Sequence, residues 1–274
     1  MERWKPGPVF WLMKMNGLRL AFSIPELLVA MALLMVLSTI SFLAIQQSSK
    51  VLFNVSGHQD VSLELAKAKR RMERDLLPAS QVSSQICACP DSLGGGGKDG
   101  QAICFLSPFD ESGSGPQKNP EGTALFRRNV IYYLSVPLGH QGCTSSADAS
   151  GYDQVCPHKV LIRQRLDYQV SAPSGNVQAL LPASDLATLL VRPNLENLGA
   201  STVDPRVRSI EVVARQLLSM RISFNADVDV FGEVEIRLWG ANLDDRKKGV
   251  VIGQDSLAGK SFLEEHRFSV FPQN

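Results

Sequence analysis

Residues 27–45 read LLVAMALLMVLSTISFLAI, an apolar run without a charged residue, a glycine or a proline. A helix rises about 1.5 Å per residue and the hydrocarbon core of a bilayer is about 30 Å thick, so about 20 apolar residues are needed to cross it. This run is just long enough. The sequence therefore predicts one membrane-spanning helix near the N-terminus of this 274-residue chain, which excludes an ordinary cytosolic protein.

The charges that precede this run predict its orientation. Residues 1–21 contain four basic side chains and one acidic side chain. By the positive-inside bias, we expect the N-terminus to stay in the cytoplasm and the chain after Ile45 to lie outside the inner membrane. A cleaved secretory signal peptide is an alternative, but its apolar core spans only about 7–15 residues and ends in a small-residue cleavage site, which this run lacks.

The net charge bears on the class of partner. The chain carries 28 Lys and Arg residues against 27 Asp and Glu residues, a formal net charge of +1. Nucleic-acid-binding domains usually concentrate Lys and Arg on one face to displace counterions. This sequence has no broad basic field of that kind, so no nucleic-acid partner is predicted.

Glu26 is a carboxylate at the start of the apolar run, where a charge is costly unless it has a partner. Its surroundings, LAFSIPELLVA over residues 20–30, resemble the class III signal of type IV prepilins and type II secretion pseudopilins. In that family a small residue precedes the cut, an apolar aromatic residue begins the mature chain, and glutamate is its fifth residue. The resemblance implies that a prepilin peptidase cleaves between Ala21 and Phe22, that Phe22 is N-methylated, and that the apolar helix is retained.

The resemblance also implies a role for Glu26. In an assembled filament, its carboxylate would neutralise the terminal ammonium of a neighbouring subunit inside the apolar helix bundle. The alternative is a glutamate that only caps the N-terminal dipole of an ordinary membrane anchor. Two positions depart from the usual family pattern. Ala21 stands where glycine is usual, and Pro25 stands where isoleucine or valine is usual. These departures point to a minor family member. Proline is tolerated in the first turn of a helix.

Residues 46–77 continue the helix beyond the apolar run. Five apolar positions recur at spacings that place them on one helix face. They are Val61, Leu65, Ala68, Met72 and Leu76. The charged residues that lie between these apolar positions, Asp75 included, are assigned to the rest of the helix surface. We expect one helix from about Pro25 to Leu77 whose second half packs this stripe on a folded head. Residues 65–79, LAKAKRRMERDLLPA, also resemble the corresponding helix of J-type pseudopilins and W-type minor pilins.

The head is predicted to be rich in strands. The expected strands are Val130–Val136, Lys159–Leu166, Ser209–Val213, Met220–Val230, Glu233–Trp239 and Phe262–Phe271. Apolar and polar residues alternate through Met220–Val230 and Glu233–Trp239. This alternation predicts an antiparallel hairpin with one packed face. Glycine and proline over residues 90–122 suggest surface loops, and a short helix is expected from Ser184 to Leu190, capped by Ser184.

These segments divide the chain into four parts. We expect a cytoplasmic leader over residues 1–21, the transmembrane half of the helix over 22–45, its periplasmic half over 46–77 and a β-rich periplasmic head with long loops over 78–274. The predicted fold class is α+β, with a long N-terminal transmembrane helix packed on an antiparallel β-sheet head. The resemblance implies that this fold is type IV pilin-like.

No catalytic constellation can be assembled from the sequence. Gly95–Gly100 fits the G-x-G-x-x-G pattern, but it lies in a glycine run between loops, so no nucleotide is expected. Asn225, Asp227 and Asp229 are spaced like calcium ligands. The next glycine, Gly232, comes one position too late for the EF-hand turn, so strand positions explain them better. The four histidines are scattered, and we predict no enzyme activity, cofactor or metal.

The five cysteines lie on the non-cytoplasmic side under this topology. They are Cys87, Cys89, Cys104, Cys143 and Cys156. Disulfides are the leading interpretation because exported proteins meet an oxidising environment. The shortest loops pair Cys143 with Cys156, and Cys104 with either Cys87 or Cys89. Closing a loop of about 15 residues is worth about 3 kcal/mol in the chain-entropy model. A zinc site is the rival, although C-x-C is not the usual zinc knuckle, and the connectivity stays open.

The sequence is thus interpreted as a structural subunit, a minor pseudopilin or minor pilin of a type II secretion or type IV pilus machine. The resemblance implies four partners: the prepilin peptidase, the helices of other pilins or pseudopilins, the inner-membrane assembly platform and the lipid bilayer. It implies a single-pass protein of the bacterial inner membrane with a periplasmic head, and a filament after assembly. The competing interpretations are a periplasmic enzyme or binding protein with an uncleaved anchor, and a secreted protein with a long signal peptide.

Overall fold

The computed structural model describes residues 23–79, 84–90, 93, 99–109, 115–138, 159–167, 179–198, 204–224, 232–242 and 262–273. The chain divides into two compact units, one that ends at Leu52 and one that begins at Phe53. Helix α1 (Ile24–Leu76) contributes its first half to the first unit and its second half to the second unit.

The described part of the first unit is the N-terminal half of α1. The whole helix begins and ends within one residue of the predicted Pro25 and Leu77, so the prediction of one long N-terminal helix is confirmed. Every described side chain from residue 24 to residue 48 is exposed. Among the described residues, α1 is the one helix that is long and apolar enough to cross a membrane.

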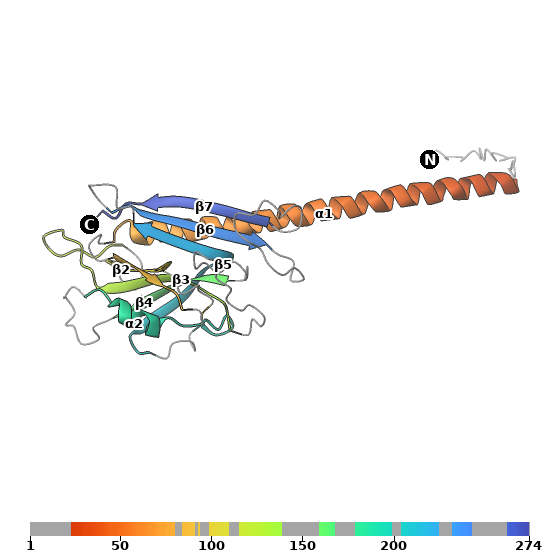
Figure 1. The fold of residues 1–274 in the computed structure, drawn as a ribbon. Coiled ribbons are helices and arrows are strands. Elements are labelled where there is room, and N and C mark those ends of the chain that lie inside the picture. The colour runs from red at the N-terminus through yellow and green to blue at the C-terminus, as the bar shows by residue number, and fades with distance from the viewer. Residues whose placement is uncertain are drawn as a thin grey trace, which may run out of the picture. The chain divides into compact units, whose positions relative to one another are not determined.

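The second unit is built on a seven-stranded antiparallel sheet whose strands lie in chain order (Figure 1). The strands are β1 (Ser84–Ala88), β2 (Asp99–Ser107), β3 (Arg128–Ser135), β4 (Lys159–Leu166), β5 (Val207–Phe224), β6 (Val234–Asn242) and β7 (Phe262–Val270). A short helix, α2 (Ala183–Leu189), lies between β4 and β5. The sheet is curled, and the expected α+β layout is confirmed.

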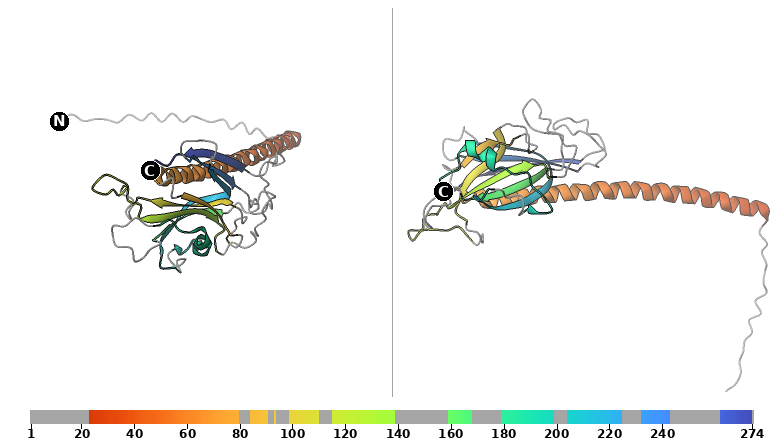
Figure 2. Two further views of the ribbon diagram at one scale, coloured as in Figure 1. Left: turned by 60° about the vertical axis from the view of Figure 1, so that its left-hand side comes forward. Right: turned by 90° about the horizontal axis from the view of Figure 1, so that it is seen from below.

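Two apolar cores lie on the two faces of this sheet. The first contains the predicted stripe of α1, whose five residues are all 0% exposed, packed with residues such as Phe105, Leu161 and Phe268 from three different strands. The second core includes Leu186 and Leu189 of α2. Figure 2 shows the C-terminal half of α1 and α2 on opposite sides of the sheet. That half of α1 is therefore a core element of the head.

Strand β5 changes partners along its length. Residues up to Ala214 pair with β4 and residues from Ser219 onward pair with β6, while Leu217 pairs with both strands. Between them Gln216 has a φ of 58°, which is uncommon for a residue other than glycine, and the register shifts next to it. Such an irregularity bends a strand and increases its twist. The strand predicted at Ser209–Val213 and the described part of the one predicted at Met220–Val230, which ends at Phe224, therefore belong to one bent strand. Residues 225–230 lie outside the described residues.

The predicted hairpin is confirmed in β5 and β6. Met220 lies opposite Leu238 and Ile222 lies opposite Ile236. Met220 and Ile222 are buried, whereas the intervening Arg221 is exposed, as the alternation predicts. Strands β3, β4 and β7 also match their predicted stretches to within two residues at each end.

Two predictions about local structure were wrong. Residues 90–122 were expected to form surface loops, but they include β2, which is buried along almost its whole length. Its apolar run is short and lies next to a glycine-rich segment, so periodicity cannot identify it. Helix α2 has Pro182 at its N-cap and no side-chain cap. Ser184 instead lies inside the first turn, where its hydroxyl is 3.2 Å from the Asp185 carboxylate.

Gly240 of β6 is a point of close approach between the sheet and α1. A Cβ atom on Gly240 would lie 2.6 Å from Cγ1 of Val61 and 3.2 Å from two atoms of Leu65. Both helix residues are fully buried, so neither has room to move. Gly240→Ala should therefore lower the free energy of unfolding by about 1–3 kcal/mol, measured by urea denaturation of the full chain in detergent.

Gly115→Ala is the matched control, because a Cβ atom there would meet nothing within 4 Å. The control should be neutral or slightly stabilising, since alanine restricts the unfolded chain. Equal stabilities of the two variants would contradict the close helix–sheet contact.

Candidate functional site

The start of α1 is organised by Ser23 and Glu26. The first helical hydrogen bond runs from the Leu27 N–H to the Ser23 carbonyl at 3.1 Å. The Glu26 carboxylate accepts hydrogen bonds from the Ser23 backbone N–H and from its hydroxyl, both at 3.1 Å. A glutamate at this position satisfies a donor that the helix leaves unpaired, as in a capping box. Glu26 therefore caps its own helix in this structure.

Ala21 and Phe22, the predicted cleavage and methylation residues, lie outside the described residues. Both Ser23 and Glu26 are on the mature side of the predicted cut, so this capping arrangement does not need the leader. The Glu26 side chain is exposed and projects from the end of an exposed apolar helix. Its pairing with a neighbouring subunit stays a prediction.

A buried ion pair joins α1 to the sheet. Asp75 is 0% exposed and Arg163 of β4 is 3% exposed, and Nε of Arg163 donates to Oδ2 of Asp75. The hydroxyl of Tyr132 on β3 donates to the same oxygen at 2.7 Å. Burial, and then the Asp75 charge, raises the pKa of Tyr132 well above its ordinary value. One carboxylate thus binds groups from two neighbouring strands.

Arg71 and Glu211 extend this ion pair toward the surface. Arg71, one helical turn before Asp75, places Nη2 2.8 Å from Oε2 of Glu211 on β5. Nη1 of Arg163 is 3.5 Å from the same oxygen. Burial is the largest single effect and would lower the pKa of Arg163, but the charge and hydrogen bond of Asp75, with Tyr132 and Glu211, together outweigh it and the pKa is raised. The cluster therefore connects α1 with three strands.

The assignment of Asp75 to the polar surface of the helix was wrong. Asp75 follows Ala68 by seven positions and Met72 by three, which is the spacing of the buried stripe itself. A carboxylate on an apolar stripe predicts a buried cationic partner, because an unpaired buried charge is strongly unfavourable. The sequence contains that signal, but it does not identify Arg163 as the partner.

Two of the four histidines come together in the tertiary structure. Nε2 of His266 is 3.0 Å from Oε1 of Glu264 on β7, and Nδ1 of His58 is 3.7 Å from the other oxygen of this carboxylate. The Ser62 hydroxyl of α1 also donates to Glu264. The described residues contain no group of three or more His, Cys, Asp or Glu arranged to hold a metal ion. This cluster therefore joins β7 to α1 through polar contacts.

The other motifs singled out in the sequence lie largely outside the described residues. This holds for Gly95–Lys98 and for all three polar residues of the calcium-like spacing. The last two residues of the glycine motif, Asp99 and Gly100, begin strand β2. A dinucleotide-binding motif instead lies at the end of a strand and the start of a helix.

Three of the five cysteines meet in the second core. Cys87, Cys89 and Cys104 are buried there, and all three are thiols in this structure. Burial, and then the Asp99 charge, raises the pKa of Cys87 to about 11. Burial raises the pKa of Cys104 further. The thiolate is the reactive form, so neither is a nucleophile near neutral pH. Cys143 and Cys156 lie outside the described residues, and all the disulfide pairings stay predictions.

Cys87 and Cys104 lie on neighbouring strands of the sheet. Cys87 lies opposite Ala102, two residues from Cys104 on the adjacent strand, so the two side chains are diagonal neighbours on one face. Cys89 belongs to the same core. The structure therefore places Cys104 and both of its candidate partners, Cys87 and Cys89, in one core.

No protein-family model, curated protein or solved structure matches this chain.

Removal of the Asp75 carboxylate should destabilise the head strongly. Asp75→Ala leaves the Arg163 guanidinium buried without its partner, and the loss of one member of a buried ion pair costs about 3–5 kcal/mol. The measurement is urea unfolding of the full chain in detergent, followed by circular dichroism.

Glu73→Ala is the matched control for Asp75→Ala on the same helix. Glu73 is 3.8 Å from Lys69, and both side chains are about 40% exposed. The loss of such an exposed pair should change stability by less than about 0.5 kcal/mol. Similar losses in the two variants would contradict a special role for the buried pair.

The disulfide prediction is tested by counting thiols in the unfolded chain. With Cys143 paired to Cys156 and Cys104 paired to Cys87 or Cys89, denatured protein should contain one reactive thiol without reductant, and reduction should release all five. Metal analysis of the same sample tests the zinc alternative. Five thiols without reductant and no bound metal would contradict both interpretations.

Proposed function

We propose that this protein is a minor pseudopilin or minor pilin, a structural subunit of a type II secretion pseudopilus or a type IV pilus. The observation that carries the proposal is the two-part surface of α1. Its N-terminal half is apolar and exposed, while one face of its C-terminal half packs against an antiparallel sheet. The segment that resembles a prepilin signal stands at the start of this helix.

The exposed half of α1 needs an apolar environment. Contiguous apolar patches of this size are rare on soluble monomers and indicate a membrane or protein contact. Before assembly the lipid bilayer would cover this surface, and in a filament the corresponding helices of other subunits would do so. The mechanism is therefore exchange of lipid contacts for helix contacts. The assembly platform and a partner ATPase would supply the energy.

Glu26 would direct this exchange. A lone carboxylate inside an apolar helix bundle is strongly unfavourable, so it favours the position in which a cation is adjacent. Prepilin cleavage would create such a cation at the Phe22 terminus of each subunit. Among the described residues, Ser23 supplies the donors to Glu26, whose side chain is exposed, so the carboxylate would be accessible to another chain.

The buried ion cluster has a mechanical role in this proposal. A force applied to α1 during assembly must reach the head without separating helix from sheet. Asp75 anchors the last turn of α1 to Arg163 and Tyr132. At the same end, the Gln273 N–H donates to the Leu77 carbonyl at 3.0 Å. The head would therefore move with its helix.

Mass spectrometry of the N-terminus after co-expression with a prepilin peptidase tests the proposal. The expected product lacks residues 1–21 and begins with N-methyl-Phe22. A chain that keeps its leader would support a membrane-anchored periplasmic enzyme or binding protein, and a terminus beyond Ile45 would support a secreted protein. Either outcome would overturn the proposal.

The same system tests the role of Glu26. Glu26→Ala and Glu26→Gln should still be cleaved but should enter filaments poorly, because neither can neutralise a terminal ammonium. Asp60→Ala is the control, since it removes an exposed carboxylate from the same helix outside the apolar run. Normal incorporation of both Glu26 variants would exclude the charge pair while leaving the processing result unaffected.

A further inference from the structure

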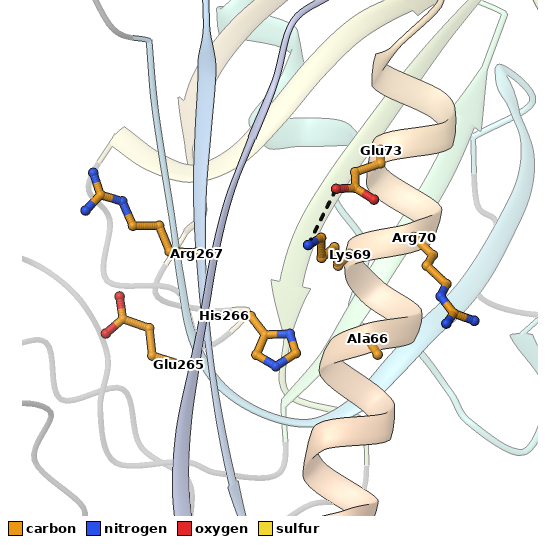
Figure 3. A pocket seen from close by; sticks show the side chains of 7 residues that line it. All are labelled: Ala66, Lys69, Arg70, Glu73, Glu265, His266 and Arg267. Atoms are coloured by element: carbon orange, nitrogen blue, oxygen red, sulfur yellow. Dashed lines mark ion pairs between the residues drawn. The ribbon is translucent and has the colours of Figure 1, made fainter.

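Strand β7 is an edge of the sheet. In the described part of the chain it pairs with β6 alone, from Phe262 to Val270. The backbone groups along its other side have no strand partner among these residues, and an unpaired edge is a template for another strand. Figure 3 shows α1 running beside β7.

Two open hollows lie where α1 and β7 run together. The first has a volume of about 580 Å³ and is lined by side chains of α1 and by Glu265, His266 and Arg267 of β7. In Figure 3, His266 lies between the strand and the helix. Arg267 projects from the side of β7 away from α1, and Arg70 projects from the side of α1 away from β7.

The second hollow continues the first toward the end of the helix. Its volume is about 830 Å³, and it is lined by α1 from Arg70 to Leu77 and by residues 269–273. Arg70 and Glu73 line both hollows. The two hollows therefore form one surface along the edge strand, which we call the β7 groove.

Cationic side chains outnumber anionic ones along the β7 groove. Four cationic and two anionic side chains line it. The cations are Lys69, Arg70, Arg74 and Arg267, and the anions are Glu73 and Glu265. Lys69 is 3.8 Å from Glu73, Arg74 is 3.7 Å from Asp75, and Arg267 is 2.7 Å from Glu235. Arg70 has no ion-pair partner among the described residues. A carboxylate bound in the groove would therefore complement Arg70 first.

One end of the β7 groove is apolar. Leu77 is 44% exposed and Phe271 is 52% exposed, and both line the second hollow. Both are among the exposed large apolar residues of the described head. A ligand that places a carboxylate beside Arg70 would also need an apolar side chain to cover Leu77 and Phe271 at this end of the groove.

Charge disfavours a second copy of this chain as the occupant of the β7 groove. Pairing β7 with another β7 would bring together two helix flanks that each carry Lys69, Arg70 and Arg74. Like charges held at close range repel, and charge repulsion of this kind disfavours a wrong partner. The charge of the groove instead matches an acidic chain.

We propose that the β7 groove binds an extended, carboxylate-rich segment of a different protein, which adds to the sheet as a strand beside β7. Hydrogen bonds to the free edge supply affinity in this mode, and alternate side chains supply specificity. Side chains on the inner side of the added strand would meet Arg70 and, at the end, Leu77 and Phe271. This inference does not depend on the proposed function, because it concerns the head alone.

A labelled peptide of about ten residues that alternates valine with glutamate is the probe. Its binding to the full chain in detergent is measured by fluorescence anisotropy. The same peptide with lysine in place of glutamate should bind at least about tenfold more weakly. Arg70→Glu should weaken binding of the acidic peptide by a similar factor. Lys118→Glu makes the same charge change at an exposed head residue outside the groove, and it should have little effect.

Two further measurements separate strand addition from general attraction between charges. Successive N–H groups of a strand point to opposite edges, so N-methylation of the valines blocks one edge of the peptide and N-methylation of the glutamates blocks the other. One of these peptides should lose binding and the other should keep it. Hydrogen exchange should slow at β7 and stay unchanged at β1, the other edge.

The outcomes decide the proposal in either direction. Loss of binding with one methylated peptide, protection of β7 and a selective effect of Arg70→Glu would establish strand addition. The proposal is overturned by no binding up to about 1 mM peptide, by equal binding of both methylated peptides, or by equal effects of Arg70→Glu and Lys118→Glu. None of these results alters the expected N-terminus of the processed chain.

Discussion

The buried carboxylate of Asp75 fixes where α1 lies on the sheet. Apolar contacts are not directional, so the stripe of the helix could pack on the same strands in several registers. Asp75 removes that freedom because it must meet both Arg163 and Tyr132 in the dry interior. The other contacts of the helix, including its close approach to Gly240, occur in the register that this pair selects.

Different parts of α1 face different environments. Its N-terminal half has an apolar surface that the described head residues leave exposed, and its start carries the capping carboxylate of Glu26. In the C-terminal half, one side enters the core and the adjoining flank carries the cations of the β7 groove. One continuous helix thus combines a buried face with an exposed half that is long and apolar enough to cross a membrane. A substitution on one part of its surface need not disturb the others.

The curl of the sheet lets strands from the whole head contact one face of α1. Every strand pairs with its sequence neighbours, and β5 bends at Gln216 as it passes from β4 to β6. The curl gathers strands from the whole head around the buried stripe. It leaves β7 as an edge beside α1, so the arrangement that completes the core also creates the groove.

The sequence by itself determined the long helix, its apolar stripe and the β5–β6 hairpin, because each depends on a local period that one segment carries alone. Val61 and Met220 could be assigned to the core from their spacing. Only the tertiary structure decided that Asp75 meets Arg163 and that β7 becomes an edge beside the basic flank of α1. The partners in these contacts are far apart in the chain. Their meeting depends on the order and bend of the strands, which no local pattern encodes.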